Sequence, residues 1–315
     1  MIRYSAPAKI ILSGEHAVVY GKPAFVSAID LRLTCTVQEA TADTQAVDET
    51  FVFVKNVVLA YLKRKDIKYT EVHLTYQIDS AIPKGRGLGS SAAFCVALSA
   101  CLYHAFTATQ PDKQVINTLA YQAEQQFHGM PSGVDVSAST QGGLIFYRKE
   151  FEFLKNISAL NFKLPKNIVD KLILIDSGKP IESTAEMVKL VGKRYNEQPQ
   201  LMEKTLMRTE KMTKRMVVAA IKEDVQLFAD TIAENQQLLI ELGIVSSSTQ
   251  QLLSQLNQYG AGKVTGAGGA EKSSGYILFL TNDKEQVVKF LDNEKLQYFD
   301  FKQDFEGVRF IPKED

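Results

Sequence analysis

The stretch PKGRGLGSSAA, residues 83–93, decides how the rest of this sequence is interpreted. Its glycines precede two serines and a run of good helix formers, so the pattern predicts a loop that leads into the first turn of a helix. Glycines let backbone N–H groups approach an anion closely, and a helix start adds unpaired N–H donors and the positive end of its dipole. The stretch therefore predicts a phosphate-binding loop.

Several alternatives stay open for this loop when it is taken by itself. Ser90 or Ser91 can cap the helix, and a hydroxyl at the same position can coordinate a Mg²⁺ that bridges phosphates. A glycine cluster can also form a turn with no ligand. The spacing fits neither GxxxxGK[ST], because no lysine follows the last glycine, nor GxGxxG, because the third spacing fails. A nucleotide fold of another kind is expected.

Composition and charge exclude several classes of protein. The chain has 315 residues, 45% hydrophobic and 23% charged, as in a globular protein of one large or two medium domains. Lys plus Arg and Asp plus Glu each number 36, so no net charge favours nucleic acid or a membrane surface. Cys35, Cys95 and Cys101 are too scattered for a disulfide framework or a metal site and are interpreted as buried thiols.

Targeting signals are also not expected. Lys9 and Glu15 flank an apolar stretch that is too short for the core of a signal peptide. The longest apolar run, residues 92–106, is shorter than the roughly 20 residues that span a bilayer, and it contains His104. We therefore expect a soluble, cytoplasmic protein.

The pattern of apolar residues predicts strands and helices in both halves of the chain. Strands are expected at residues 9–12, 31–37, 71–78, 142–147, 171–176, 275–281 and 308–312, and helices at 51–64, 113–128 and 284–294. The second half is rich in helices, and Met212 and Met216 are interpreted as core residues of a long one. Residues 150–168 look irregular and contain Pro165, so the predicted domains are 1–165 and 166–315. The fold class is α+β, in two lobes with a cleft between them.

Three segments together point to a family. SAPAKIILSGEHAVVYGKPA (residues 5–24), PKGRGLGSSAA and GKVTGAGGA (residues 262–270) occur in the order and spacing of the three motifs of the GHMP kinases. This superfamily comprises galactose, homoserine, mevalonate and phosphomevalonate kinases, and the resemblance spans nearly the whole chain. It implies an N-terminal domain similar to ribosomal protein S5 domain 2, a ferredoxin-like C-terminal domain, and ATP bound over the central loop.

The resemblance also implies which residues contact ATP: Pro83, Lys84, Gly85, Arg86, Gly87, Leu88, Gly89, Ser90, Ser91 and Ala92, with Gly266, Ala267 and Gly268 of the third motif. That third motif usually reads TGAGGGGC, whereas residues 265–274 read TGAGGAEKSS. Residues 265–268, whose glycines allow the backbone to approach a ligand closely, are kept. Because Ala270, Glu271 and Lys272 replace later glycines, we expect side chains to crowd that edge, which leaves ATP affinity open.

Two carboxylates and a lysine are candidate catalytic groups. Glu124 near a helix end and Asp135 after a turn can face one cleft, although a solvated Glu and an Asx-turn Asp are the alternatives. Lys9 lies in the strand pattern AKIIL, where a charge is costly unless it is paired or reaches water. The chain most resembles the mevalonate kinase branch, which implies that Glu124 and Ser91 bind Mg²⁺, that Asp135 is the catalytic base, and that Lys9 pairs with Asp135 and lowers the pKa of the acceptor hydroxyl.

The same resemblance implies the acceptor site and the reaction. Glu15, His16, Asp135 and Thr184 would contact mevalonate, with a structural role as the alternative for His16. Residues 235–246, NQQLLIELGIVS, also resemble a segment of that branch. For this segment and for residues 176–184, which carry Thr184, the alternative is that they cap and pack helices. The implied function is phosphorylation of mevalonate in isoprenoid synthesis. Competing hypotheses are a phosphomevalonate, galactose or homoserine kinase, a mevalonate diphosphate decarboxylase, which usually lacks the matching lysine, or a ligand-sensing homologue without turnover. The oligomeric state stays open, a homodimer included.

Overall fold

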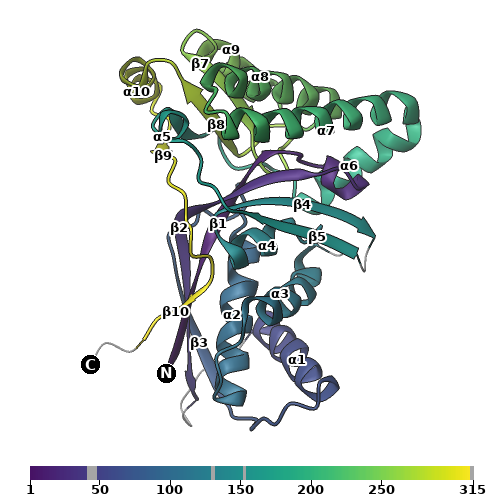
Figure 1. Cartoon of the computed structure of the whole chain (residues 1–315), viewed down its shortest axis with the longest axis vertical. Helices are drawn as coiled ribbons and strands as arrows, with labels where there is room; N and C mark the ends of the chain where they lie inside the picture. The colour runs from purple at the N-terminus through teal and green to yellow at the C-terminus, as the bar shows by residue number, and fades with distance from the viewer. Residues whose placement is uncertain (41–47, 129–131, 152–153, 313–315) are drawn as a thin grey trace.

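A computed structural model describes residues 1–40, 48–128, 132–151 and 154–312, which form two lobes that each contain a β-sheet. The first sheet and its helices form the lower part of Figure 1, and the second sheet with the longer helices forms the upper part. Residues 129–131, where the sequence predicts that a helix breaks, lie outside the described residues. The predicted α+β fold in two lobes is confirmed.

The first sheet runs in the order β10-β1-β2-β4-β5, and β3 also pairs with β2. All these pairings are antiparallel, and the strands are β1 (Ile2–Ser13), β2 (Ala24–Glu39), β3 (Leu74–Ser80), β4 (Leu144–Phe151), β5 (Leu154–Leu160) and β10 (Arg309–Phe310). β1 is buried over nearly its whole length, and its Pro7 lies at a register shift, where the missing N–H removes no regular ladder bond. β1 is therefore the central support of this lobe.

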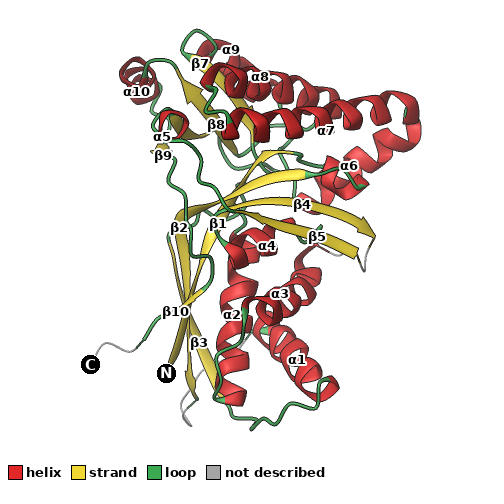
Figure 2. Ribbon diagram, in the orientation of Figure 1, coloured by secondary structure: helices red, strands yellow, loops and turns green. Residues whose placement is uncertain are grey.

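Helices cover this sheet on the side of α2, as Figure 2 shows. They are α1 (Glu49–Arg64), α2 (Ser90–Thr107), α3 (Lys113–His128) and α4 (Val134–Gln141), and a short 3-10 turn, η1 (Ala17–Tyr20), follows β1. α2 is long and apolar enough to cross a membrane, the one such helix in the described ranges, but 61% of it is buried in this lobe. Its buried residues pack against β1 and β2, as those of a core helix do. The three cysteines are free and buried, as expected.

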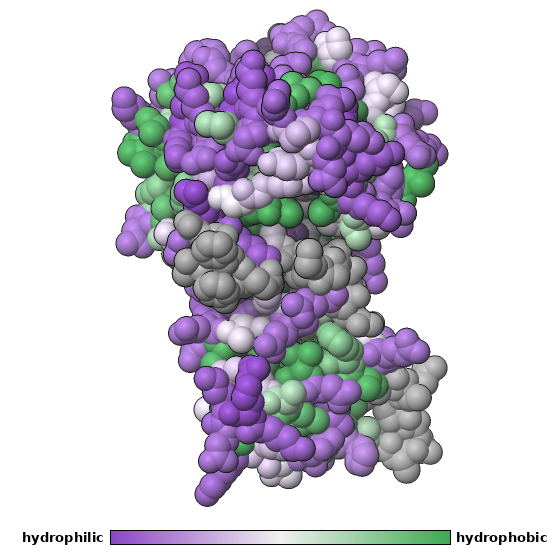
Figure 3. All heavy atoms as spheres, turned by 90° about the vertical axis from the view of Figure 1, so that its right-hand side faces the viewer, coloured by the Kyte–Doolittle hydropathy of each residue, from purple (hydrophilic) through white to green (hydrophobic). Residues whose placement is uncertain are grey.

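The second sheet has the order β7-β8-β6-β9 and comes from a β-α-β-β-α-β chain order. That arrangement is ferredoxin-like, as predicted. Its strands are β6 (Leu172–Asp176), β7 (Gly260–Val264), β8 (Tyr276–Thr281) and β9 (Tyr298–Asp300), and the helices of this part of the chain are α5 (Lys166–Val169), α6 (Thr184–Glu197), α7 (Pro199–Ile221), α8 (Val225–Leu242), α9 (Ser247–Leu256) and α10 (Lys284–Asn293). Met212 and Met216 of α7 are buried, and hydrophilic side chains dominate the upper part of the face in Figure 3.

Two segments differ from the sequence prediction. Residues 150–168 are not irregular throughout, because β5 forms an antiparallel pair with β4. The strand expected at residues 308–312 exists as β10, but it pairs with β1 of the first sheet. The partner of β10 lies at the other end of the chain, and local sequence carries little sign of it. The pairing of β5 is local, because β5 directly follows β4 along the chain. The division into domains 1–165 and 166–315 stays a prediction.

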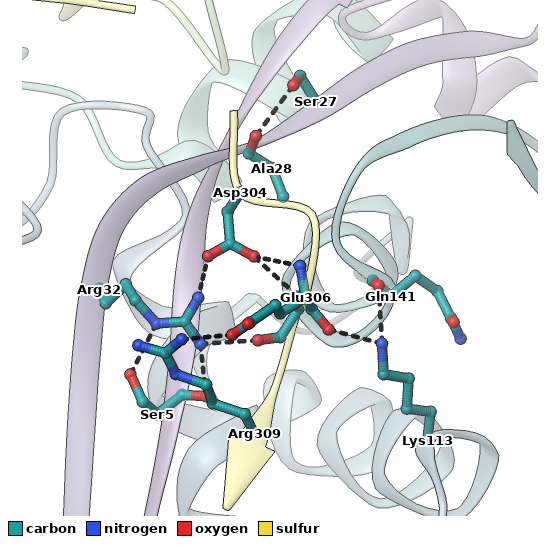
Figure 4. Close-up of polar contacts among 10 residues, drawn as sticks. Ser5, Ser27, Ala28, Arg32, Lys113, Gln141, Asp304, Glu306 and Arg309 are labelled. Carbon is teal, nitrogen blue, oxygen red and sulfur yellow. Dashed lines mark hydrogen bonds and ion pairs between the residues drawn. The ribbon is translucent and has the colours of Figure 1, made fainter. Parts of the chain in front are cut away.

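The segment before β10 is fastened to the first lobe by a polar cluster, which Figure 4 shows in close-up. Asp304 forms an ion pair with Arg32 of β2, and Arg32 also donates to Ser5 of β1. Lys113 of α3 donates to the carbonyl oxygens of Gln141 and Glu306, at 2.9 and 2.6 Å. Because Gln141 ends α4, these contacts fix the helix whose first turn carries Asp135.

Candidate active site

A cleft of about 1250 Å³ lies between the two lobes. It is lined by β1, the loop before α2, the first turn of α4, the loop between β6 and α6, and the third motif. Every predicted ATP-contact residue lines it except Pro83 and Ala92. The volume exceeds that of a usual small-molecule pocket, so the cleft has room for two ligands.

The loop before α2 has the conformation that its glycines predict. Gly85, Gly87 and Gly89 have φ angles of 69°, 86° and 77°, in the left-handed region that favours glycine. Gly89 is the N-cap residue of α2 and no side chain caps the helix, so the capping role considered for Ser90 and Ser91 is wrong. Gly87 packs on the third motif, because a Cβ there would lie 2.8 Å from the carbonyl oxygen of Thr265. The loop is a cradle that a side chain would fill, which fits an anionic ligand.

Lys9 and Asp135 lie together at this loop. The Lys9 Nζ is 3.0 Å from Asp135 Oδ1, and the two side chains are 2% and 29% exposed. The backbone N–H of Lys9 donates to Leu88 O at 3.0 Å, and the Lys9 stem passes Gly89, where a Cβ would lie 3.0 Å from Cε. A buried ammonium therefore holds a partly exposed carboxylate beside the phosphate cradle, and the contact expected between them is present.

Glu124 and Ser91 both line the cleft, from α3 and the first turn of α2. A carboxylate and a hydroxyl are the oxygen donors that Mg²⁺ prefers, usually together with substrate phosphates. In the described ranges, no three His, Cys, Asp or Glu side chains lie close enough to hold a metal. A Mg²⁺ here would therefore need phosphate and water oxygens as further ligands. Glu124 and Ser91 fit such a partly protein-bound ion.

Glu15 lies behind the cleft and does not line it. It forms an ion pair with Lys263 of β7, and the two side chains are 1% and 0% exposed. Burial raises the pKa of Glu15 and lowers that of Lys263, while their pairing opposes both shifts. Lys263 Nζ also donates to Ile11 O at 3.2 Å. The pair thus joins the first motif to the third, a link that sequence reasoning missed.

His16 lines the cleft, and its ring is fixed by the third motif. Its Nε2 lies 2.9 Å from Ala267 O, a carbonyl that can only accept, so Nε2 carries the proton. Burial lowers the pKa of His16, which favours the neutral ring. Nδ1 is then an acceptor. His16 therefore both makes a structural contact and lines the cleft, so the two roles considered for it are compatible.

The loop between β6 and α6 forms another wall of the cleft, next to the phosphate loop. Thr184, at the start of α6, lines the cleft next to Ser183, whose capping box with Glu186 begins the helix. Asp176 forms an ion pair with Arg86 of the phosphate loop. This wall also carries Lys179, which sequence reasoning did not single out.

The altered end of the third motif is directed toward this wall. Of the third motif, only Gly266, Ala267, Gly268 and Ser274 line the cleft. The backbone N–H groups of Ala270 and Glu271 both donate to Glu182 Oε1, at 3.0 and 2.9 Å. The side chains that replace glycines therefore do not crowd the cleft as expected, and Glu182 is a further residue that the sequence gave no reason to choose.

Residues 235–246 hold the first and third motifs in place. Asn235 Oδ1 accepts from Ser13 at 3.0 Å, and Gln236 Oε1 accepts from the N–H of Val264 at 3.0 Å. Both side chains are buried. These contacts show that Asn235 and Gln236 anchor β1 and β7 to α8.

An apolar wall closes the cleft beyond the start of the phosphate loop. Leu33, Ile78, Tyr76 and Phe94 line it, and the rings of Tyr76 and Phe94 lie 6.1 Å apart. Asp48 and Thr75 add polar groups there. Flat rings beside a few polar atoms suit a nucleobase. These residues come from β2, β3, α2 and the segment before α1, so no continuous sequence motif marks them.

Comparison with known proteins now identifies the family. Residues 52–143 match the family model of the GHMP kinase N-terminal domain, and residues 216–293 match that of the GHMP kinase C-terminal domain. The mevalonate kinase of Archaeoglobus fulgidus is 32% identical over 276 residues, which cover 84% of this chain and 88% of that protein. The chain belongs to the GHMP kinases. It is therefore an ATP-using kinase of small molecules.

Other relatives agree with the family but not on one substrate. The mevalonate kinase of Pyrococcus furiosus is 31% identical over 320 residues, covering 90% of each chain. A mevalonate kinase crystal structure has a TM-score of 0.77 at 23% identity, covering 97% of this chain and 100% of that one. The Streptococcus pneumoniae phosphomevalonate kinase, in complex with phosphomevalonate and AMPPNP, also has a TM-score of 0.77, at 16% identity over 96% of this chain and 100% of that one. The fold of this GHMP kinase alone does not select the acceptor.

Proposed function

We propose that this chain transfers the γ-phosphoryl group of ATP to the 5-hydroxyl of mevalonate. The observation that carries the proposal is the Lys9–Asp135 ion pair beside the glycine-rich cradle. Phosphoryl transfer depends on positioning and charge neutralisation more than on covalent chemistry, and it needs a group that takes the proton of the acceptor hydroxyl. A partly exposed carboxylate held by a buried lysine meets that need.

The residues take the following roles in this proposal. The phosphate loop and the start of α2 hold the triphosphate of ATP, and the wall that contains Tyr76 and Phe94 holds its nucleobase. The acceptor hydroxyl oxygen forms a bond to the γ-phosphorus, the bond from that phosphorus to the β–γ bridging oxygen breaks, and Asp135 takes the hydroxyl proton. Lys9 stabilises the negative charge on the oxygen. Mg²⁺, held by Ser91 and Glu124, would supply charge neutralisation for the phosphates.

Sequence similarity supports mevalonate as the acceptor. Mevalonate kinases are about 30% identical to this chain over most of its length. Of the four residues expected at the acceptor, His16, Asp135 and Thr184 line the cleft, and Glu15 does not. A coupled assay of ADP release with mevalonate, phosphomevalonate, galactose and homoserine tests the choice. Turnover of mevalonate above the others is expected, and no turnover of mevalonate while another acceptor reacts would refute it.

Asp135→Asn tests the catalytic base. It keeps the size of the side chain but removes the proton acceptor, so we expect kcat to fall by about 10²–10⁴-fold. The Kd for ATP should change little, since Asp135 faces the acceptor. Asp170→Asn, an exposed carboxylate outside the cleft, is the matched control. Equal rates for Asp135→Asn and the wild type would remove Asp135 from the mechanism. Calorimetry that shows ATP binding with no ADP formation for any acceptor would favour the ligand-sensing alternative.

A further inference from the structure

Two lysine side chains lie against the phosphate loop, one at each end. Lys9 passes Gly89, and Lys179 passes Gly85, where a Cβ would lie 3.1 Å from Lys179 Cε and 3.8 Å from its Nζ. The two ammonium groups differ in their partners. Lys9 is paired with Asp135, whereas Lys179 is exposed and has no ion pair or hydrogen bond from its side chain within the described residues.

The turn that carries Lys179 is fixed from its N-terminal side. Gly178 has a φ of 107°, and its N–H donates to Asp176 Oδ1 at 2.8 Å. The other oxygen of Asp176 pairs with Arg86 of the phosphate loop. The turn is therefore bound to the loop against which Lys179 lies.

The altered end of the third motif fixes the same turn from the other side. Ser273 Oγ donates to the carbonyl of Lys179 at 2.6 Å, and the N–H of Gly275 donates to the carbonyl of Gly178 at 3.2 Å. A Cβ on Gly178 would lie 3.2 Å from Ser273 Cβ, so the two segments are in close contact. Ser273 directly follows Ala270, Glu271 and Lys272, where the usual glycine-rich motif is changed. Ser273 supplies an anchor for the backbone of Lys179.

The position of the Lys179 ammonium is unfavourable without a ligand. The start of α2 already gathers N–H donors and the positive end of a helix dipole, and a cation nearby adds repulsion. A bound anion reverses the sign of both effects. Since the Lys9–Asp135 pair marks the Gly89 end as the place of transfer, a phosphate beside Gly85 lies away from the reacting group.

We propose that Lys179 binds the diphosphate part of the nucleotide that remains in ADP, reaching it across the cleft from the second lobe. The inference rests on the proposed function, in which ATP phosphates occupy the cradle. It also gives the residue that follows the changed part of the third motif a role, because Ser273 holds the backbone of Lys179 beside the phosphate loop. Lys179 then binds ATP and ADP alike.

Calorimetry with ATP, ADP and AMP, without acceptor, tests this assignment. Lys179→Met keeps the length of the side chain and removes its charge, so the Kd for ATP and for ADP should rise about 10-fold, as for the loss of one hydrogen bond to a charged group. AMP binding should change less. Lys272→Met, an exposed lysine of the third motif outside the cleft, is the matched control and should bind all three like the wild type. Ser273→Ala should weaken ADP binding by a smaller factor.

Four results would overturn the assignment. Equal Kd values for the wild type and Lys179→Met would overturn the assignment but leave the proposed function standing. Weaker ATP binding with unchanged ADP binding would place Lys179 at the transferred phosphate instead. In the coupled assay of ADP release, an effect of Lys179→Met that is confined to the KM of the acceptor would place Lys179 at the acceptor. No ATP binding by the wild type would refute the proposed function as well. Because Lys179 is exposed, its variant should fold, and an unchanged unfolding midpoint checks this.

Discussion

The phosphate loop and the third motif both present glycine backbone to the same cleft, but they are held in different ways. The phosphate loop takes its shape from the left-handed conformations of Gly85, Gly87 and Gly89, which the sequence itself specifies. The third motif is held by contacts with distant segments: its Lys263 pairs with Glu15, and Glu182 accepts from its later N–H groups. Gly266 and Gly268 of the third motif are left-handed too, so the two regions differ at the later residues of that motif, whose N–H groups are bound by a carboxylate.

This difference explains why the third motif tolerates a change that the phosphate loop does not show. A left-handed residue that packs on another backbone has no substitute for glycine. N–H groups that point away from the ligand can instead be bound by a carboxylate, as Ala270 and Glu271 are by Glu182. The three variants below test the two kinds of support.

The largest effect is expected from breaking the support under the third motif. Lys263→Met leaves the carboxylate of Glu15 buried without its partner, and its Oε2 already has no hydrogen bond. Removing one partner of a buried ion pair costs about 3–5 kcal/mol of the free energy of unfolding. Urea unfolding measures it.

The double variant Lys263→Met/Glu15→Leu should recover most of that loss, because two apolar side chains leave no unpaired charge. Lys289→Met, from the exposed pair with Glu285, is the surface control and should change stability little. A double variant as unstable as Lys263→Met would show that size, not charge, matters at this position.

An intermediate effect is expected where the two regions touch. Gly266 has a φ of 89°, and a Cβ on it would lie 2.8 Å from Gly87 Cα and O. Gly266→Ala therefore strains the backbone by about 1–3 kcal/mol and pushes the two loops apart, which should raise the Kd for ATP about 10-fold or more. Calorimetry measures the Kd.

Gly192→Ala is the control for this variant, because Gly192 lies in α6 and a Cβ there meets only Tyr20 at 3.8 Å. The control should keep its ATP affinity and be slightly more stable, since alanine favours a helix. ATP affinity equal to that of the wild type in Gly266→Ala would mean that the two loops need not touch.

The smallest effect is expected from weakening the support of the later N–H groups. Glu182→Gln keeps an oxygen acceptor but removes its charge, and a hydrogen bond to a neutral group is about half as strong. We expect the contact between the β6–α6 loop and the third motif to weaken by about 1 kcal/mol of free energy, which should raise the KM for the acceptor about fivefold. Glu271→Gln, an exposed neighbour, is the control, and equal KM values for the two variants would contradict the role of Glu182.

Much of the fold and of the candidate site could be predicted because the signals were local or shared with a family. Helix 113–128 matches α3, and the apolar periodicity that predicts it depends only on neighbouring residues. The contact of Lys9 with Asp135 followed from a charge in a buried strand and a matching motif. The pairing of β10 escaped prediction because its partner, β1, lies at the other end of the chain. β5 pairs with the preceding strand β4, so a distant partner does not explain why it escaped prediction.

The sequence by itself determined that the chain is a GHMP kinase with a loop of left-handed glycines before α2, since glycine positions and motif order can be identified from the residues alone. Only the tertiary structure decided that Glu15 faces Lys263, that Lys179 lies beside Gly85, and that the changed part of the third motif binds Glu182 of the loop between β6 and α6. The physical reason is that a side chain's role depends on where its polar group finds a partner. Residues 176–182 and 262–275 are far apart in the chain, so only the folded structure brings those partners together.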